Sequence, residues 1–138
     1  MEQPMHGVVL LDVSPGASEA FERSFLEKVG HPALVCHGPH EGTVCPLLEG
    51  KGCADFEAAH GIVFELDLDR PQHLAIVERY RELGREGLPI RVVATPEQAE
   101  RYRDELAGVE VWTHEPTAAD LDGFAAEVEA TDRWQDSE

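Results

Sequence analysis

Near the start of the chain stands Gly7-Val8-Val9-Leu10-Leu11-Asp12-Val13, an apolar run whose one charged residue is a carboxylate close to its end. A short, continuous run of this kind is typical of a strand that is buried on both faces of a parallel sheet. A helix is expected directly after it, because Ser14 can serve as its N-cap and Pro15 suits a first helical turn. The chain therefore opens with the strand and helix pair from which parallel α/β sheets are built.

The first predicted helix carries three apolar side chains at helical spacing, Phe21, Phe25 and Val29, and is expected to end at Gly30. The best-defined helix start comes later, at Thr95-Pro96-Glu97-Gln98. This stretch combines an N-cap threonine, a first-turn proline and a capping-box glutamine. Both helices follow directly after a predicted strand.

Strands and helices alternate along the rest of the sequence, which predicts an α/β fold with a parallel sheet and helices on both faces. The length fits one domain spanning residues 1–138, and residues from about 131 to 138 are expected to form a flexible acidic tail. The remaining strands are expected at 33–35, 61–67, 89–94 and 109–112, and the remaining helices at 54–60 and from about 69, 95 and 117 onward.

The charge of the chain excludes several classes of partner. Acidic residues outnumber basic ones by 28 to 11, which gives a formal net charge of -17. A field of this sign repels phosphate backbones and anionic lipid surfaces, so neither nucleic acid nor membrane is expected as a partner. No run reaches the roughly 18 apolar residues of a membrane span, and the first residues lack the order of a signal peptide. We therefore expect a cytoplasmic protein, in which thiols are usually kept reduced.

All three cysteines fall in one segment rich in Gly and Pro, residues 36–53, which is expected to replace or shorten the second helix. Cys36, His40, Cys45 and Cys53 could converge on a tetrahedral metal ion, zinc or iron, although their spacing matches neither a zinc ribbon nor the common iron-sulfur motifs. Alternatively, the thiols act as small apolar groups that fasten the segment to the core, or as redox groups. The sequence leaves these alternatives open.

Ligands of parallel α/β sheets gather at the carboxyl ends of the strands. The residues expected there are Asp12, Cys36, Asp67, Thr95 and Glu115. The turn after the first strand lacks the lysine and the repeated glycines of a phosphate-binding loop, so nucleotide and flavin cofactors are disfavoured. No cofactor is expected unless the cysteine segment binds zinc.

The chain resembles the receiver domains of two-component response regulators at four places. These are Asp12, Asp67 and Thr95 at the ends of the first, third and fourth strands, and Pro116 just after the fifth. In receivers the corresponding places hold a metal-binding acid, the phosphorylated aspartate, a switch Thr or Ser, and the proline of a Lys-Pro pair. The resemblance implies a flavodoxin-like fold whose five strands are ordered 2-1-3-4-5.

The chain departs from the receiver pattern beside two of these places. Val13 stands where the family commonly has a second acidic residue, and Glu115 stands where it has the lysine. The receiver-like pocket that the resemblance implies therefore comprises Asp12, Asp67, Thr95 and Glu115. Phosphoryl transfer to a carboxylate needs Mg²⁺ bound by several oxygens and a cation that neutralises the developing charge. The departures therefore imply a degenerate receiver, or pseudo-receiver, which is not an enzyme.

We expect a non-catalytic regulatory or protein-interaction module that acts in signal transduction. Receivers commonly dimerise through the fourth and fifth helices and the fifth strand, so a protein partner or a homodimer is expected. The alternative function is a metal-binding or thiol redox sensor built on the cysteine segment. The surface that corresponds to the receiver dimer interface includes Arg101, Arg103, Trp112 and Glu115.

Overall fold

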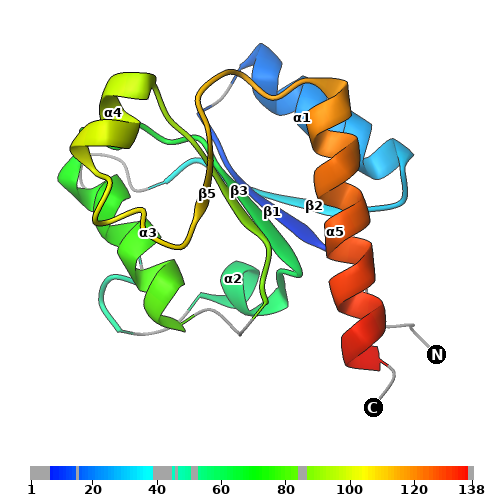
Figure 1. Ribbon diagram of the computed structural model, residues 1–138. Coiled ribbons are helices and arrows are strands. Elements are labelled where there is room, and N and C mark those ends of the chain that lie inside the picture. Colours follow the sequence, from blue (N-terminus) through cyan, green and yellow to red (C-terminus); the bar gives the residue numbers. More distant parts are fainter. Residues whose placement is uncertain are drawn as a thin grey trace.

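The structure is a computed structural model that describes residues 7–14, 16–38, 45, 47–50, 53–83 and 87–136; the side chains of 17, 18 and 132–136 are not described. Strands and helices alternate along these residues, as the sequence predicts (Figure 1). In chain order they are β1 (Val9–Asp12), α1 (Ala17–Lys28), β2 (Ala33–Cys36), α2 (Ala54–Ala58), β3 (Gly61–Phe64), α3 (Pro71–Leu83), β4 (Ile90–Val93), α4 (Pro96–Arg101), β5 (Glu110–Trp112) and α5 (Ala118–Asp136).

The five strands form one sheet in the order β2-β1-β3-β4-β5, and every neighbouring pair is parallel. The flavodoxin-like order predicted from the sequence is therefore confirmed. Strand β1 lies between β2 and β3, and its last residue, Asp12, is in register with Cys36 on β2 and Phe64 on β3. All four residues of β1 are buried, as expected for a strand covered on both faces.

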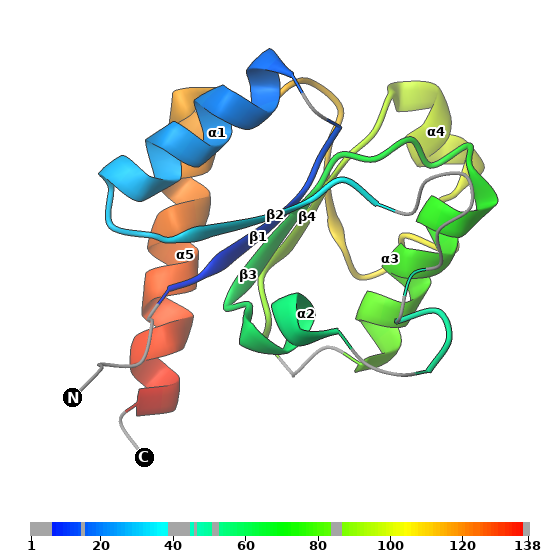
Figure 2. The ribbon, with the colours of Figure 1, turned by 180° about the vertical axis from the view of Figure 1, so that it is seen from behind.

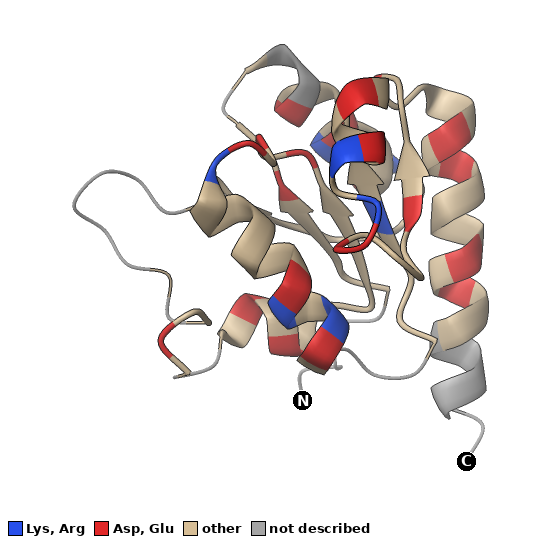
Figure 3. Ribbon diagram, turned by 60° about the vertical axis from the view of Figure 1, so that its left-hand side comes forward, with Lys and Arg blue, Asp and Glu red and all other residues tan. Residues whose placement is uncertain are grey.

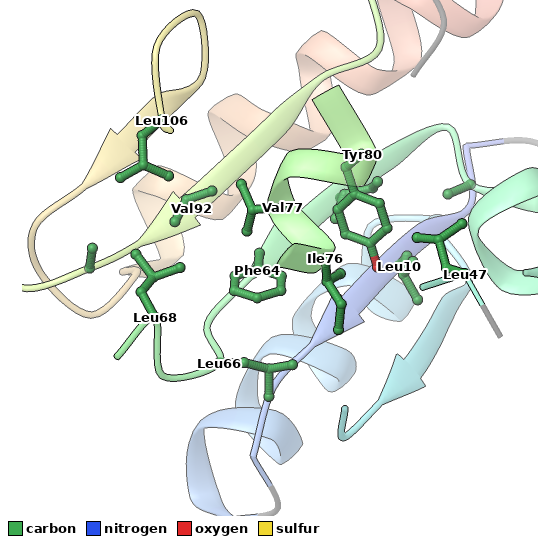
Figure 4. Packing of buried hydrophobic residues seen from close by; sticks show 13 residues of the cluster. Leu10, Leu47, Phe64, Leu66, Leu68, Ile76, Val77, Tyr80, Val92 and Leu106 are labelled. Atoms are coloured by element: carbon green, nitrogen blue, oxygen red, sulfur yellow. The ribbon is translucent and has the colours of Figure 1, made fainter. Parts of the chain in front are cut away.

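Helices cover both faces of the sheet (Figures 1 and 2). Helices α1 and α5 pack on one face and contact each other, while α2, α3 and α4 lie on the opposite side. Because successive side chains of a strand point to opposite faces, Leu10 belongs to the core under α3 and Leu11 to the core under α1 and α5. The core under α3 is shown in Figure 4, and its labelled members are Leu10, Leu47, Phe64, Leu66, Leu68, Ile76, Val77, Tyr80, Val92 and Leu106.

Helix α1 presents a different face to the sheet from the one its apolar spacing indicates. Phe21 is 46% exposed and Val29 is 41% exposed, whereas Leu26 and Glu22 are buried. The helix also begins later than predicted, because its N-cap is Gly16 and no side chain caps it. Phe21 and Val29 have helical spacing, but they lie on a different side of the helix from the residues that face the core. One of the core-facing positions is occupied by Glu22.

Two other expectations concern the ends of elements. The second helix is short, as predicted for the segment that carries the cysteines. Helix α5 continues through Thr131 to Asp136, so the helix extends beyond the point where the sequence analysis begins the acidic tail. Residues 137–138, the end of that predicted tail, lie outside the described residues. No helix among the described residues has both the length and the apolar character needed to cross a membrane.

Helix α5 approaches the sheet most closely at Gly61, the first residue of β3. A Cβ atom at this position would lie 2.5 Å from Val128 and 3.0 Å from Phe124, both of which are buried on α5. Contacts this short cannot be accommodated unless the helix or the strand moves. Gly61 therefore sets the distance between β3 and α5.

We predict opposite effects of the same substitution at two glycines. Gly61→Ala is expected to lower the free energy of unfolding by about 1–3 kcal/mol, because it overpacks the contact between β3 and α5. Gly123→Ala is the matched control on α5, where a Cβ meets no atom within 4 Å; it should raise the stability by about 0.5–1 kcal/mol through helix propensity. Urea denaturation of the two variants measures both changes, and a stabilising Gly61→Ala would contradict the packing described here.

Candidate functional site

An open cavity of about 470 Å³ lies beyond the carboxyl ends of β3, β4 and β5. This is the edge where parallel α/β sheets bind ligands. Three of the four residues predicted for the receiver-like pocket line it: Asp67, Thr95 and Glu115. The remaining lining residues are Glu65, Leu66, Val93, Ala94, Pro96, Gln98, Thr113 and His114.

Asp67 is tied to the start of helix α4 by the side chain of Gln98. The Asp67 Oδ1 atom accepts a hydrogen bond from Gln98 Nε2 at 3.0 Å and another from the backbone N–H of Asp69 at 3.0 Å. The same glutamine completes the predicted capping box, because its Oε1 accepts from the Thr95 N–H while Thr95 Oγ1 accepts from the Gln98 N–H. Asp67, Gln98 and Thr95 thus form one hydrogen-bonded unit across two strand ends.

A second set of contacts joins the same loop to α4. The Asp69 Oδ1 atom accepts hydrogen bonds from Arg101 Nη1 and from the Tyr102 hydroxyl, each at 2.7 Å. The Tyr102 and Gln98 hydrogen bonds, together with the Arg101 charge, lower the pKa of the Asp69 carboxyl group. Because this network is exposed to solvent, it positions α4 more than it stabilises the fold.

Asp12, the fourth predicted pocket residue, does not line the cavity. Its side chain shares the α3 face of the sheet with Leu10 and is 1% exposed. The Tyr80 hydroxyl donates a hydrogen bond of 2.7 Å to Asp12 Oδ2, and Figure 4 shows the ring of Tyr80 reaching from α3 toward β1. The next residue, Val13, is buried in the core under α1 and α5.

Burial raises the pKa of Asp12 to about 7, although the hydrogen bonds from Tyr80 and Cys36 act in the opposite direction. Since this pKa lies above the ordinary value of 3.8 for an aspartate, the contribution of Asp12 to stability is complete below about pH 4. It is lost as the pH rises through about 7. Asp12 is therefore a structural acid of the α3 core, and the sequence analysis did not identify Tyr80 as its partner.

The cavity has an acidic lining, and acidic residues are spread over the helices and loops of the whole molecule (Figure 3). Glu65 and Glu115 line it together with Asp67, and none of the described residues that line it is a lysine or an arginine. His114 also lines the cavity, and its Nε2 lies 2.8 Å from Asp120 Oδ2 at the start of α5. The position that the receiver pattern assigns to a lysine thus holds an exposed glutamate.

The three cysteines pack against the α3 core. Cys36, Cys45 and Cys53 are half-buried free thiols that contact the cluster containing Leu47. His40, the fourth member of the predicted metal site, lies outside the described residues. Among the residues that the structure describes, no group of three or more His, Cys, Asp and Glu side chains is arranged to hold a metal ion. Packing against the core supports the apolar role of these thiols, and the zinc site stays a prediction.

Solved structures that are similar to this chain include receiver domains. The receiver domain of a sensor histidine kinase from Pseudomonas aeruginosa, solved with a magnesium ion in its active site cleft, matches with a TM-score of 0.64 and 12% identity, covering 91% of this chain and 98% of that one. A Francisella response regulator receiver domain matches with a TM-score of 0.61 and 14% identity, covering 93% and 98%. An orphan response regulator of H. pylori matches with a TM-score of 0.58 and 18% identity, covering 91% and 98%.

These similarities show the fold of the chain, which is that of a receiver domain. No protein-family model matches the sequence, and no curated protein matches it either. The resemblance stated from four strand-end residues is therefore confirmed for the architecture.

The Tyr80 and Asp12 contact gives a first prediction for this region. Tyr80→Phe should lower the free energy of unfolding by about 1–3 kcal/mol, because it leaves a buried carboxyl group without that donor. It should also raise the pKa of Asp12 further, since the Tyr80 hydrogen bond lowers it. Tyr102→Phe is the matched control, because it removes an exposed hydroxyl bond to Asp69 and should cost less than about 1 kcal/mol. Equal losses in urea denaturation would contradict this assignment.

A second prediction concerns the thiols. Burial raises the pKa of the Cys36 thiol to about 11, and all three cysteines pack against the core, so native protein should react slowly with a disulfide reagent at pH 8. Unfolding in urea should make all three react rapidly. Ser24→Cys places a reference thiol on the exposed face of α1 and should add one fast-reacting group. Rapid native labelling of the wild type would favour a redox role, and labelling released by a chelator would favour a bound metal.

Proposed function

We propose that this chain is a non-catalytic regulatory module, a receiver-like domain that acts through protein contacts without phosphoryl transfer. One observation carries the proposal: the Asp12 carboxyl group lies on the α3 face of the sheet, bonded to Tyr80, and not in the cavity that contains Asp67. A phosphorylation site needs several oxygens around Mg²⁺ beside the acceptor. Here β1 contributes none of them, because Val13 is also buried, in the opposite core.

The charge of the cavity supports the same proposal. Phosphoryl transfer develops negative charge on the transferred group, which a lysine or metal ion must balance. Glu65, Asp67 and Glu115 line the cavity without a lysine or arginine among its described lining residues. A phosphate that entered would therefore meet carboxylates of its own sign.

We further propose that the output surface of the module is formed by α4, β5 and α5. Gln98 donates a hydrogen bond to Asp67 and Arg101 donates one to Asp69, and these bonds connect the cavity edge directly to α4. A change in the position of Asp67 or Asp69 would therefore change the position of α4. A protein partner or a second copy of the chain would bind across this surface, which includes Arg101, Arg103, Trp112 and Glu115.

The test is incubation with acetyl phosphate or beryllofluoride in the presence of Mg²⁺, followed by intact mass measurement and by ¹⁹F NMR for beryllofluoride. We expect no stoichiometric modification of the wild type or of Glu115→Lys, because a lysine supplies one charge and no metal ligand. Asp67→Asn is the control for site assignment. Modification of the wild type that disappears in Asp67→Asn would contradict the proposal.

Adding Val13→Asp to Glu115→Lys is not expected to restore the site. Val13 is 4% exposed and packs in the core under α1 and α5, so the new carboxylate would be buried among apolar groups. The double variant should therefore lose stability without gaining phosphate. Stoichiometric phosphorylation of a folded double variant would show that the strand end can turn toward the cavity.

A further inference from the structure

Helix α1 buries a glutamate in the core of the molecule. Glu22 is 1% exposed and lies one helical turn before Leu26, which is fully buried. Among the described residues, none donates a hydrogen bond to either of its carboxyl oxygens, and both oxygens are removed from solvent. An ionised carboxylate in such a place is strongly disfavoured, because it has lost its hydration and gained no donor.

The group that Glu22 faces is a second carboxyl group, that of Glu65 at the end of β3. Glu65 follows Val63 by two residues and so lies on the same face of the sheet, toward α1 and α5. Its Oε2 atom is also buried and also lacks a donor. Two ionised carboxylates cannot hydrogen bond to each other, since both are acceptors. One proton between them gives each carboxyl group a hydrogen bond and removes one of the two buried charges.

Among the residues that the structure describes, the buried cation on this face of the sheet is Arg91 of β4. Its guanidinium group forms ion pairs with Glu110 and Glu127, so it does not take the place of that proton. Glu115, after β5, adds a further negative charge that acts on both residues. Just after β2, His37 contacts Glu19 of α1 at 3.1 Å. At the start of α5, Asp120 contacts His114, and on β1 Asp12 lies on the opposite face of the sheet.

We propose that Glu22 and Glu65 share one proton at neutral pH, and that this proton holds helix α1 against the end of β3. The Glu22 carboxyl group is the donor and the Glu65 carboxylate is the acceptor. The oxygens that lack donors have no accessible surface, so a proton fits between them where a hydrated cation does not. The pair is connected to the cavity at the strand ends through Glu65, which is one of the lining residues of that cavity.

The direction of the pKa shifts agrees with this arrangement. Burial raises the pKa of Glu22 to about 9, and the neighbouring carboxylates of Glu65 and Glu115 add to the effect. Burial also raises the pKa of Glu65, while its hydrogen bond from Glu22 lowers it, as expected for the acceptor. Because the pKa of Glu22 is higher in the folded state than the ordinary glutamate value of 4.5, its contribution to stability is complete below about pH 4.5. That contribution is lost as the pH rises through about 9.

Infrared spectroscopy in D₂O tests the proposal directly, because a protonated carboxyl group has a carbonyl band that carboxylates lack. At pH 8, where Asp12 with its pKa of about 7 is mostly ionised, we expect this band in the wild type and its loss in Glu22→Gln. In the wild type the band should titrate with a midpoint near 9, which separates it from Asp12, whose pKa is about 7. Absence of such a band in the folded wild type would overturn the proposal without any variant.

Urea denaturation between pH 6 and pH 9 provides the second measurement. The midpoint of the wild type should fall across this range, whereas the midpoint of Glu22→Gln should fall less, because the glutamine amide donates to Glu65 at every pH. Glu97→Gln, on the exposed side of α4, is the matched control and should keep the wild-type slope. A Glu22→Gln variant with the slope of the wild type would contradict a shared proton.

Divalent cations distinguish the proton from a metal. Under the proposal, Mg²⁺ or Ca²⁺ at neutral pH should shift the unfolding midpoint of wild type and Glu22→Gln equally. Stabilisation of the wild type alone would identify the pair as a cation site and overturn the proposal. Neither result depends on whether Asp67 accepts phosphate, so the two proposals fail independently.

Discussion

The alternation of side chains along β1 is the constraint on which the rest of the structure depends. This strand lies inside the sheet and is covered on both faces, so each of its side chains must be accommodated by a core. Leu10 and Asp12 fall on the α3 face, while Leu11 and Val13 fall on the face of α1 and α5. The carboxyl group of Asp12 therefore needs a donor inside the α3 core, which Tyr80 supplies from 68 residues away. That bond joins α3 to β1 beside the apolar contacts of Ile76 and Val77, and the Asp12 carboxyl group does not line the cavity.

Local patterns were sufficient to predict the order and type of the elements. The capping box at Thr95 is written in four consecutive residues, so its geometry follows from the sequence and is found in the structure. The face of α1 is different, because Phe21, Phe25 and Val29 satisfy the helical period as well as the buried positions do. Which side of α1 faces the core is decided by its contacts with β1 and α5. Because Glu22 is on the buried side, a prediction that places polar residues at the surface chooses the wrong side.

For the candidate site, the sequence predicted which residues lie at the strand ends but not the direction of their side chains. Asp67, Thr95 and Glu115 lie at strand ends, and the topology alone brings strand ends to one edge of the sheet. Side-chain direction at those ends depends on where each strand stops and on long-range partners. Asp12 turns toward Tyr80 and Glu65 toward Glu22, and neither partner is adjacent in sequence. These pairs are determined by helix packing. A sequence pattern can therefore predict which residues lie near a site, but not which of them contact each other.

The cavity balances its negative charge with neutral donors. The Gln98 amide bonds to Asp67, and under the shared-proton proposal the Glu22 carboxyl group bonds to Glu65. Donors of this kind satisfy carboxylate oxygens without leaving a positive charge to attract an anion, in contrast to lysine or a metal ion. The Gln98 bond also joins the end of β3 to the cap of α4 with no ligand present. Under the proposed function, the bonds of Gln98 and Arg101 hold α4 in place without a ligand. A partner protein would then act by competing for Gln98 or for Arg101, whose bond to Asp69 is exposed to solvent.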